Sequence, residues 1–181
     1  NTYSDTNVRQ AGVDEGDIVK TDGKYIYAVG KKNAEESDYR NIIRIVKTAN
    51  AGMEQTACID LSALEKEKTT IDIEEIYVKD NRLIVVASQF VEYYYETEDG
   101  TVKNYRGAYN RLHDQELVYV ITYDVSNPKH IKKSGTVKQQ GRYGNSRMVD
   151  GYVYLISTYT PYSVIKSSCV PKINGERISY K

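Results

Sequence analysis

The sequence is poor in several residue types, and each shortage excludes a class of protein. Its two cysteines, Cys58 and Cys169, are too few for a disulfide framework or for a zinc site without further ligands. Lysine plus arginine and aspartate plus glutamate are equal at 25 each, so no net charge draws the chain to nucleic acid or to an anionic membrane. We therefore expect no nucleic-acid partner, and we favour two separate thiols over a Cys58–Cys169 disulfide.

Long hydrophobic runs are also missing. The longest one, Leu83 to Ala87, has the length of a β-strand, whereas a membrane-spanning helix needs roughly 20 apolar residues. We expect that this chain does not insert into a membrane. The chain begins at Asn1 without an initiator methionine, which we interpret as processing or excision from a longer protein.

One short phrase occurs three times: Asp22-Gly23-Lys24-Tyr25-Ile26-Tyr27, Asp80-Asn81-Arg82-Leu83-Ile84-Val85 and Asp150-Gly151-Tyr152-Val153-Tyr154-Leu155. An Asp-Gly or Asp-Asn pair supplies the two positive φ angles of a tight hairpin turn, and the β-branched and aromatic residues after it are typical of the returning strand. Each copy therefore predicts a hairpin, and recurrence at several tens of residues is typical of propeller blades or solenoid units.

The repeats predict an all-β fold, a β-propeller fragment of about two and a half four-stranded blades. We expect a lead-in segment at 1–16 and an incomplete propeller over 17–181, with blades at about 17–60, 75–138 and 145–181, the last one partial. The polar segment Glu96 to Gln115 is interpreted as a surface excursion of the second blade.

Two and a half blades cannot close a ring, because propellers contain roughly four to eight blades. The apolar surface at the open end of such a fragment must therefore be covered by other protein. The open side of the third blade should expose Val153, Leu155 and Ile165. We expect self-association through that side, or coverage by the remainder of the chain's own propeller.

Three segments also resemble a known family. Asn7 to Tyr27 is similar to the opening signature of bacterial secreted proteins with a C-terminal β-propeller domain, distantly related to WD40 repeats. Tyr123 to Pro128 resembles that family's blade-ending phrase, and Gly141 to Leu155 its Ser-Arg blade opening. The resemblance implies an exported or cell-envelope protein, usually anchored near its N-terminus, with no established enzymatic activity and no catalytic residues. Gly16 stands where the resemblance implies a small alanine.

An acidic cluster, formed by Asp14, Glu15, Asp17 and Asp22, is a weak Ca²⁺ candidate, since hard cations take such oxygens from loops. It lacks the spacing of an EF-hand. We favour a solvated turn whose carboxylates accept hydrogen bonds from backbone amides, and we expect no metal and no cofactor.

Catalytic groups are hard to find. His113 lies beside Asp114 and His130 lies in a charged segment, but neither has an identifiable serine or cysteine nucleophile. The sequence contains neither Gly-x-Ser-x-Gly nor His-Glu-x-x-His. We expect no enzymatic activity.

Tyrosine is abundant, with 18 copies against one phenylalanine and no tryptophan, and it suits half-solvated β-surfaces. Its copies Tyr93, Tyr95, Tyr143, Tyr159 and Tyr162 are candidates for a surface that binds a protein or a glycan. The alternative is that they only pack on the strands. Arg147, after Ser146 at a blade opening, is interpreted as a buried side chain that bonds strand carbonyls, with a ligand in the central channel as the alternative.

These observations favour an extracytoplasmic, secreted or surface-anchored binding or scaffolding module whose ligand is a protein or glycan of the cell envelope. One alternative is part of an envelope-polymer hydrolase whose catalytic groups lie outside this chain. The other is a structural domain that depends on a metal. Fold alone does not decide among them.

Overall fold

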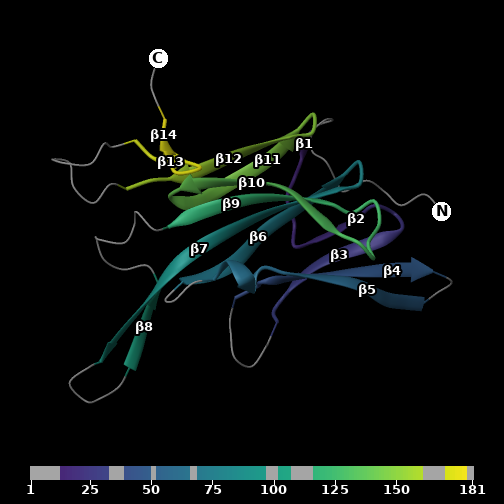
Figure 1. The fold of residues 1–181 in the computed structure, drawn as a ribbon, viewed down its shortest axis with the longest axis horizontal. Helices are drawn as coiled ribbons and strands as arrows, with labels where there is room; N and C mark the ends of the chain where they lie inside the picture. The colour runs from purple at the N-terminus through teal and green to yellow at the C-terminus, as the bar shows by residue number, and fades with distance from the viewer. Residues whose placement is uncertain are drawn as a thin grey trace.

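The computed structural model describes residues 13–32, 39–49, 52–65, 69–96, 102–106, 116–160 and 170–178. Three antiparallel β-sheets stack as layers, with the second sheet between the first and the third (Figure 1). The described ranges contain one 3-10 turn, η1 (Ser62–Leu64), and no helix that is long and apolar enough to cross a membrane. The all-β prediction is confirmed.

The first sheet is a four-stranded meander. Its strands follow chain order: β2 (Val19–Thr21), β3 (Tyr25–Gly30), β4 (Ile42–Ala49) and β5 (Gly52–Asp60). Alternation along β3 and β4 directs Tyr27, Ile43 and Ile45 toward the second sheet, where all three are buried.

The second sheet is built on four long strands, β6 (Thr69–Lys79), β7 (Arg82–Glu96), β9 (Leu117–Asp124) and β10 (Lys132–Gln140). Beyond Val91, β7 continues and pairs with β8 (Val102–Arg106), so that this hairpin projects away from the three layers (Figure 1). The predicted excursion Glu96 to Gln115 begins at this projection. Residues 97–101 and 107–115 lie outside the described ranges.

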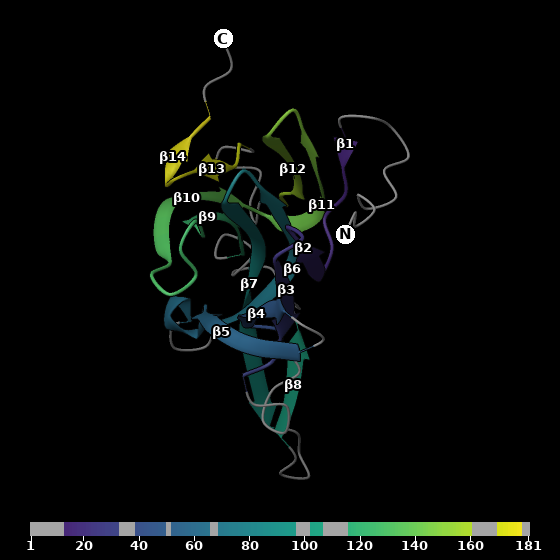
Figure 2. The same ribbon diagram turned by 90° about the vertical axis from the view of Figure 1, so that its right-hand side faces the viewer.

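The third sheet contains β11 (Arg142–Val149) and β12 (Tyr152–Thr158), with the short strand β1 (Val13–Asp14) on the other side of β11. Figure 2 shows β1 beside these strands, although it comes from the start of the chain. The hairpin β13 (Lys172–Ile173) and β14 (Glu176–Arg177) pairs with β10 of the second sheet. β13 and β14 therefore extend the second sheet, whereas we had grouped residues 145–181 as one blade.

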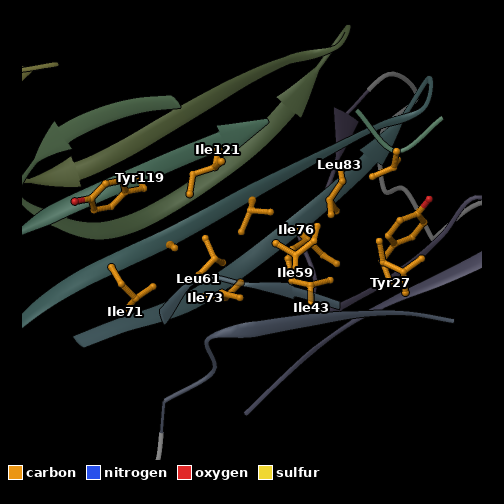
Figure 3. Close-up of a cluster of buried hydrophobic side chains, with 14 residues drawn as sticks. Tyr27, Ile43, Ile59, Leu61, Ile71, Ile73, Ile76, Leu83, Tyr119 and Ile121 are labelled. Carbon is orange, nitrogen blue, oxygen red and sulfur yellow. The ribbon is translucent and has the colours of Figure 1, made fainter. Parts of the chain in front are cut away.

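Two apolar cores hold the layers together. The larger lies between the first and second sheets and includes Ile43, Ile59, Ile73, Ile76 and Leu83 (Figure 3). The smaller lies between the second and third sheets. It is made of Tyr77, Ile84, Val86, Val118 and Met148, with Val153 and Leu155 packed against it. Both faces of the second sheet are therefore covered.

Two of the three predicted tight turns have the expected backbone. Asp80-Asn81 and Asp150-Gly151 each connect two paired strand residues, and all four have positive φ angles. The prediction is wrong for Asp22-Gly23. Only Gly23 has a positive φ there, and strand pairing ends at Thr21 and Ile26 rather than next to the Asp-Gly pair. The Asp22 carboxylate accepts hydrogen bonds from the backbone N–H groups of Lys24 and Tyr25 within this loop.

The predicted exposed side of the third sheet also needs correction. Val153 and Leu155 face the second sheet, and the exposed apolar residues are the alternate ones, Tyr152, Tyr154 and Ile156. A strand alternates with a period of two, so the sequence defines two rows but does not say which one meets the neighbouring sheet. Ile165 lies outside the described ranges.

Candidate functional site

The N-terminal strap, residues Val13–Asp17, crosses the first strands of the second and third sheets. Val13 and Asp14 pair with Val149 and Met148 of β11. Asp17 then forms a two-way backbone bridge with Ile76 of β6, at N···O distances of 3.4 and 2.8 Å. The first strand of the first sheet, β2, follows directly. The strap therefore connects β2, β6 and β11, one strand from each of the three sheets.

Beneath the strap lies the Glu75 cluster, defined as Glu75, Tyr77, Tyr143 and Ser146. Glu75 Oε1 accepts a hydrogen bond from the Tyr77 hydroxyl at 2.9 Å and another from the Ser146 hydroxyl. The Tyr77 and Ser146 oxygens are themselves 2.9 Å apart. Glu75 and Tyr77 come from β6, whereas Ser146 comes from β11, and all three are buried. The cluster thus joins the second and third sheets through a hydrogen-bonded carboxylate.

Both tyrosines of the cluster are held in the neutral form. Burial is the main cause that raises the pKa of Tyr143 to about 12, and its hydrogen bond to Glu75 adds to the rise. Burial also raises the pKa of Tyr77 above its usual range. A neutral phenol donates a hydrogen bond to a carboxylate, as the Tyr77 hydroxyl does to Glu75.

The strap also carries ion pairs to the first and third sheets. The ammonium of Lys20, a buried residue of β2, donates to Asp14 Oδ1 at 3.0 Å and to the backbone oxygen of Glu15. Glu15 Oε1 in turn lies 3.9 Å from a guanidinium nitrogen of Arg147 on β11. Since a buried charge needs a partner, the strap provides the groups that allow Lys20 to lie inside.

The four acidic Ca²⁺ candidates do not meet in one place. Asp14 pairs with Lys20, and Glu15 faces Arg147. Asp17 Oδ1 accepts the Ile18 N–H at 2.7 Å, and the second Asp22 oxygen accepts the Tyr27 hydroxyl at 2.9 Å. Within the described ranges, no group of three or more histidine, cysteine, aspartate or glutamate side chains is placed to hold a metal ion.

The candidate tyrosines are likewise dispersed. Tyr143 belongs to the Glu75 cluster and is half-buried, as is Tyr159 after β12. The side chains of Tyr93 and Tyr95, and all of Tyr162, lie outside what the structure describes. Among the tyrosines whose side chains the structure describes, the well-exposed ones are Tyr152 and Tyr154, which the sequence analysis did not select.

The remaining candidates are placed as follows. Arg147 bonds the carbonyl oxygen of Ser146 at 2.7 Å, but its side chain is 42% exposed, so its predicted burial is wrong. His130 is exposed in the turn before β10. Cys58 is an exposed free thiol on β5. His113 and Cys169 lie outside the described ranges.

The hydrogen bonds of the Glu75 cluster suit a role in holding the second and third sheets together. Ser146 is 1% exposed and its hydroxyl is bonded to Glu75 and Tyr77, so it has no free path to a substrate. A buried carboxylate that accepts several hydrogen bonds holds its neighbours in a fixed arrangement. The cluster and the strap therefore set the relative positions of the sheets.

Stacked antiparallel sheets whose first strands converge on one strap define an incomplete β-propeller. The chain matches the model of the beta propeller domain family over residues 3–178, and it belongs to that family. Searches among curated proteins and among solved structures gave no match.

Several residues of this site escaped the sequence analysis. Lys20 and Glu75 were passed over because each is one charged residue inside a strand. The available signal was alternation, since Glu75 and Tyr77 must share one face of β6 with Ile76 on the other. Nothing in the sequence indicated that this face would meet Ser146.

Proposed function

We propose that this chain is an extracytoplasmic binding or scaffolding module of a bacterial secreted or cell-envelope protein, and that it has no catalytic activity of its own. Membership of the beta propeller domain family supports a binding or scaffold module. The bacterial, secreted setting rests on the resemblance of Asn7 to Tyr27 and of the blade-opening segment around Ser146.

The observation that carries the binding role is the contrast between the two faces of the third sheet. On the face toward the second sheet, Ser146 is buried and bonded to Glu75 and Tyr77 of β6. On the outer face of the same sheet, Tyr152 and Tyr154 are 72% and 61% exposed. Exposed tyrosines on a rigid sheet offer large contact areas with a hydroxyl that bonds a partner, which suits recognition of a protein or a glycan.

The test is a binding assay with purified envelope material. The 181-residue chain is incubated with peptidoglycan sacculi and, separately, with lipid vesicles that carry isolated envelope proteins. The bound chain is measured by co-sedimentation. We expect saturable binding that falls at least about tenfold in a Tyr152→Ser/Tyr154→Ser double variant, about 1.4 kcal/mol of binding free energy. The variant Ile178→Ser, at an exposed position directly after β14, serves as the control.

Two results would contradict the proposal. One is equal sedimentation of the chain with and without envelope material. The other is release of soluble sugars or peptides from the sacculi by the chain alone, which would identify a hydrolase. Fractionation of the source cells with an antibody to the chain tests the location, and a cytoplasmic signal would exclude the extracytoplasmic role.

A further inference from the structure

The zero net charge of the chain does not reveal how unevenly its charges are distributed along the sequence. Residues 1–124 contain 15 lysine and arginine residues against 23 aspartate and glutamate residues, whereas residues 125–181 contain ten against two. The stretch 125–149 contains six of these ten cations and no acidic residue. Such an asymmetry indicates a local basic surface within a neutral protein.

The structure gathers these cations along the outer margin of the second sheet. The basic row is defined as six exposed cations on β10, on the turn before it and on the hairpin β13–β14: Lys129, Lys132, Lys133, Lys138, Lys172 and Arg177. Figure 2 shows β10, β13 and β14 side by side. The first and third sheets cover the two faces of the second sheet, so this margin does not depend on what packs against their own outer faces.

The charges of the basic row are not neutralised by ion pairs. Elsewhere in the described ranges, cations do form ion pairs with carboxylates, as Lys20, Lys32, Arg40, Arg142 and Arg147 show. Asp124 and Glu176 lie on the neighbouring strands β9 and β14, but no described carboxylate lies within ion-pair distance of a member of the row. Like charges repel each other, so a row of one sign costs stability that an anionic partner would restore.

Protection of a sheet edge does not account for the basic row. Lysine on an exposed edge strand discourages pairing with a strand of another chain. Charges of either sign can protect an edge, however, and Lys129 lies before β10 begins at Lys132. The single sign of the row therefore indicates recognition of an anion.

The shape of the row favours an extended ligand. Lys132 and Lys138 lie six residues apart on one strand, which corresponds to about 20 Å. The hairpin pairs with β10 at Gln139, so in the described ranges the outer edge of β10 has no partner strand from Lys132 to Val137. The outward backbone N–H groups of this edge can donate hydrogen bonds beside the lysine ammonium groups. Phosphate oxygens of a polymer accept from both kinds of donor.

We propose that the basic row binds a linear polymer of phosphodiester-linked units in the cell envelope. Five of its six cations are lysines, which bind phosphate as point charges, whereas carboxylates are matched best by the planar fork of arginine. The inference rests on the proposed function for the envelope location. It adds a ligand class and a surface separate from Tyr152 and Tyr154.

The experiment titrates poly(glycerol phosphate) into the full 181-residue chain by calorimetry, at salt concentrations from about 20 to 200 mM. We expect saturable binding whose log K falls linearly with log salt, by about 0.7 per contacted charge, as for a flexible polyanion. Lys132→Gln/Lys133→Gln should weaken binding at least about tenfold at low salt and reduce that slope by about 1.4, because two of the contacts are lost.

The matched control is Lys24→Gln/Lys47→Gln. It changes the net charge by the same amount at exposed lysines in the β2–β3 loop and on β4, and it should bind like the unaltered chain. Circular dichroism verifies that every variant is folded. An equal loss of binding in the two double variants overturns the inference, because net charge alone would then explain the binding.

Other ligands provide the remaining outcomes. Absence of binding to poly(glycerol phosphate) at about 20 mM salt overturns the inference. Tighter binding to polygalacturonate does so as well, because carboxylates would then be the preferred anions. Tighter binding to vesicles of equal parts phosphatidylglycerol and phosphatidylcholine, or to oligothymidylate with the same number of phosphates, would instead identify a membrane or a nucleic acid as the partner.

Failure of this inference can be told apart from failure of the proposed function. Loss of polymer binding with retained, tyrosine-dependent sedimentation with envelope material removes this inference and leaves the proposed function. Polymer binding by a chain that antibody fractionation locates in the cytoplasm removes the proposed function, and with it the envelope as the source of the polymer.

Discussion

Gly16 of the N-terminal strap lies so close to Glu75 that a methyl group on Gly16 would overlap the Glu75 carboxylate. The resemblance to secreted propeller proteins implies alanine at this position, and the structure gives the physical reason for glycine. Glu75 is not free to move aside, because Tyr77 and Ser146 hold its Oε1 atom. The residue without a side chain allows the strap to close over the cluster.

Gly16→Ala should therefore destabilise the fold. Overpacking a filled interior costs about 1–3 kcal/mol, and we expect a loss of unfolding free energy in that range by urea denaturation. The matched control is Gly135→Ala, where an added Cβ meets no atom within 4 Å, and its effect should stay within about 0.5 kcal/mol. Equal stability of both variants would show that the strap does not press on Glu75.

The Lys20–Asp14 pair should respond unequally to loss of its two members. Removing one partner of a buried pair costs about 3–5 kcal/mol, and because the Asp14 side chain is 26% exposed we expect about 1–3 kcal/mol for Asp14→Ala. Lys20→Met keeps the buried chain length and leaves an aspartate that water can reach, so its effect should stay below about 1 kcal/mol. Urea unfolding of both variants measures the difference. A Lys20→Met loss as large as that of Asp14→Ala would contradict this account.

Alkaline pH should destabilise the protein through the buried Tyr143. The pKa of Tyr143 is raised from 10.0 to about 12, so the native state keeps a proton that the unfolded state loses. Stability is therefore complete below pH 10 and falls as pH rises from 10 to about 12. Unfolding free energy measured across that range should fall less steeply in Tyr143→Phe than in the unaltered chain. Identical slopes would mean that Tyr143 is accessible to solvent.

The projecting hairpin should be dispensable. Strand β8 pairs with β7 alone, and the sheet below it is complete through the pairing of Arg82 to Gln89 with β9. Deleting Glu96 to Gln115 and joining the strands should change the melting temperature by no more than a few degrees. Calorimetry provides the measurement. Loss of cooperative unfolding in this deletion would show that the segment is part of the core.

Much of the fold was predictable because its signals are local. The pairs Asp80-Asn81 and Asp150-Gly151 mark two-residue hairpins, and the apolar strands around them specify layered sheets. Asn174-Gly175, with positive φ angles at both residues, is a further hairpin signal that the sequence contained and we did not use. Local turn chemistry thus locates hairpins but not the sheet that each one joins.

The parts that could not be predicted depend on pairing between distant segments. Residues 1–16 were interpreted as a lead-in, yet Val13 and Asp14 form a strand with β11. The Asp22-Gly23 loop differs from the other two turns because the Asp22 side chain accepts hydrogen bonds from the backbone, which its Asp-Gly pair does not reveal. The Glu75 cluster requires Ser146 from another sheet. These contacts follow from the packing of sheets, which sequence periodicity does not determine.

The strap also has a consequence for the order of folding. Val13 pairs with Val149, so Val13 leaves the ribosome long before its partner strand has been made. Closing so long a loop is slow, and its entropy must be offset by contacts that form late. Until β11 exists, Lys20 lacks the fixed strap that holds Asp14 beside it. At that stage the apolar residues of the nascent first sheet are least protected from aggregation. A chaperone would be of most use at this point of synthesis.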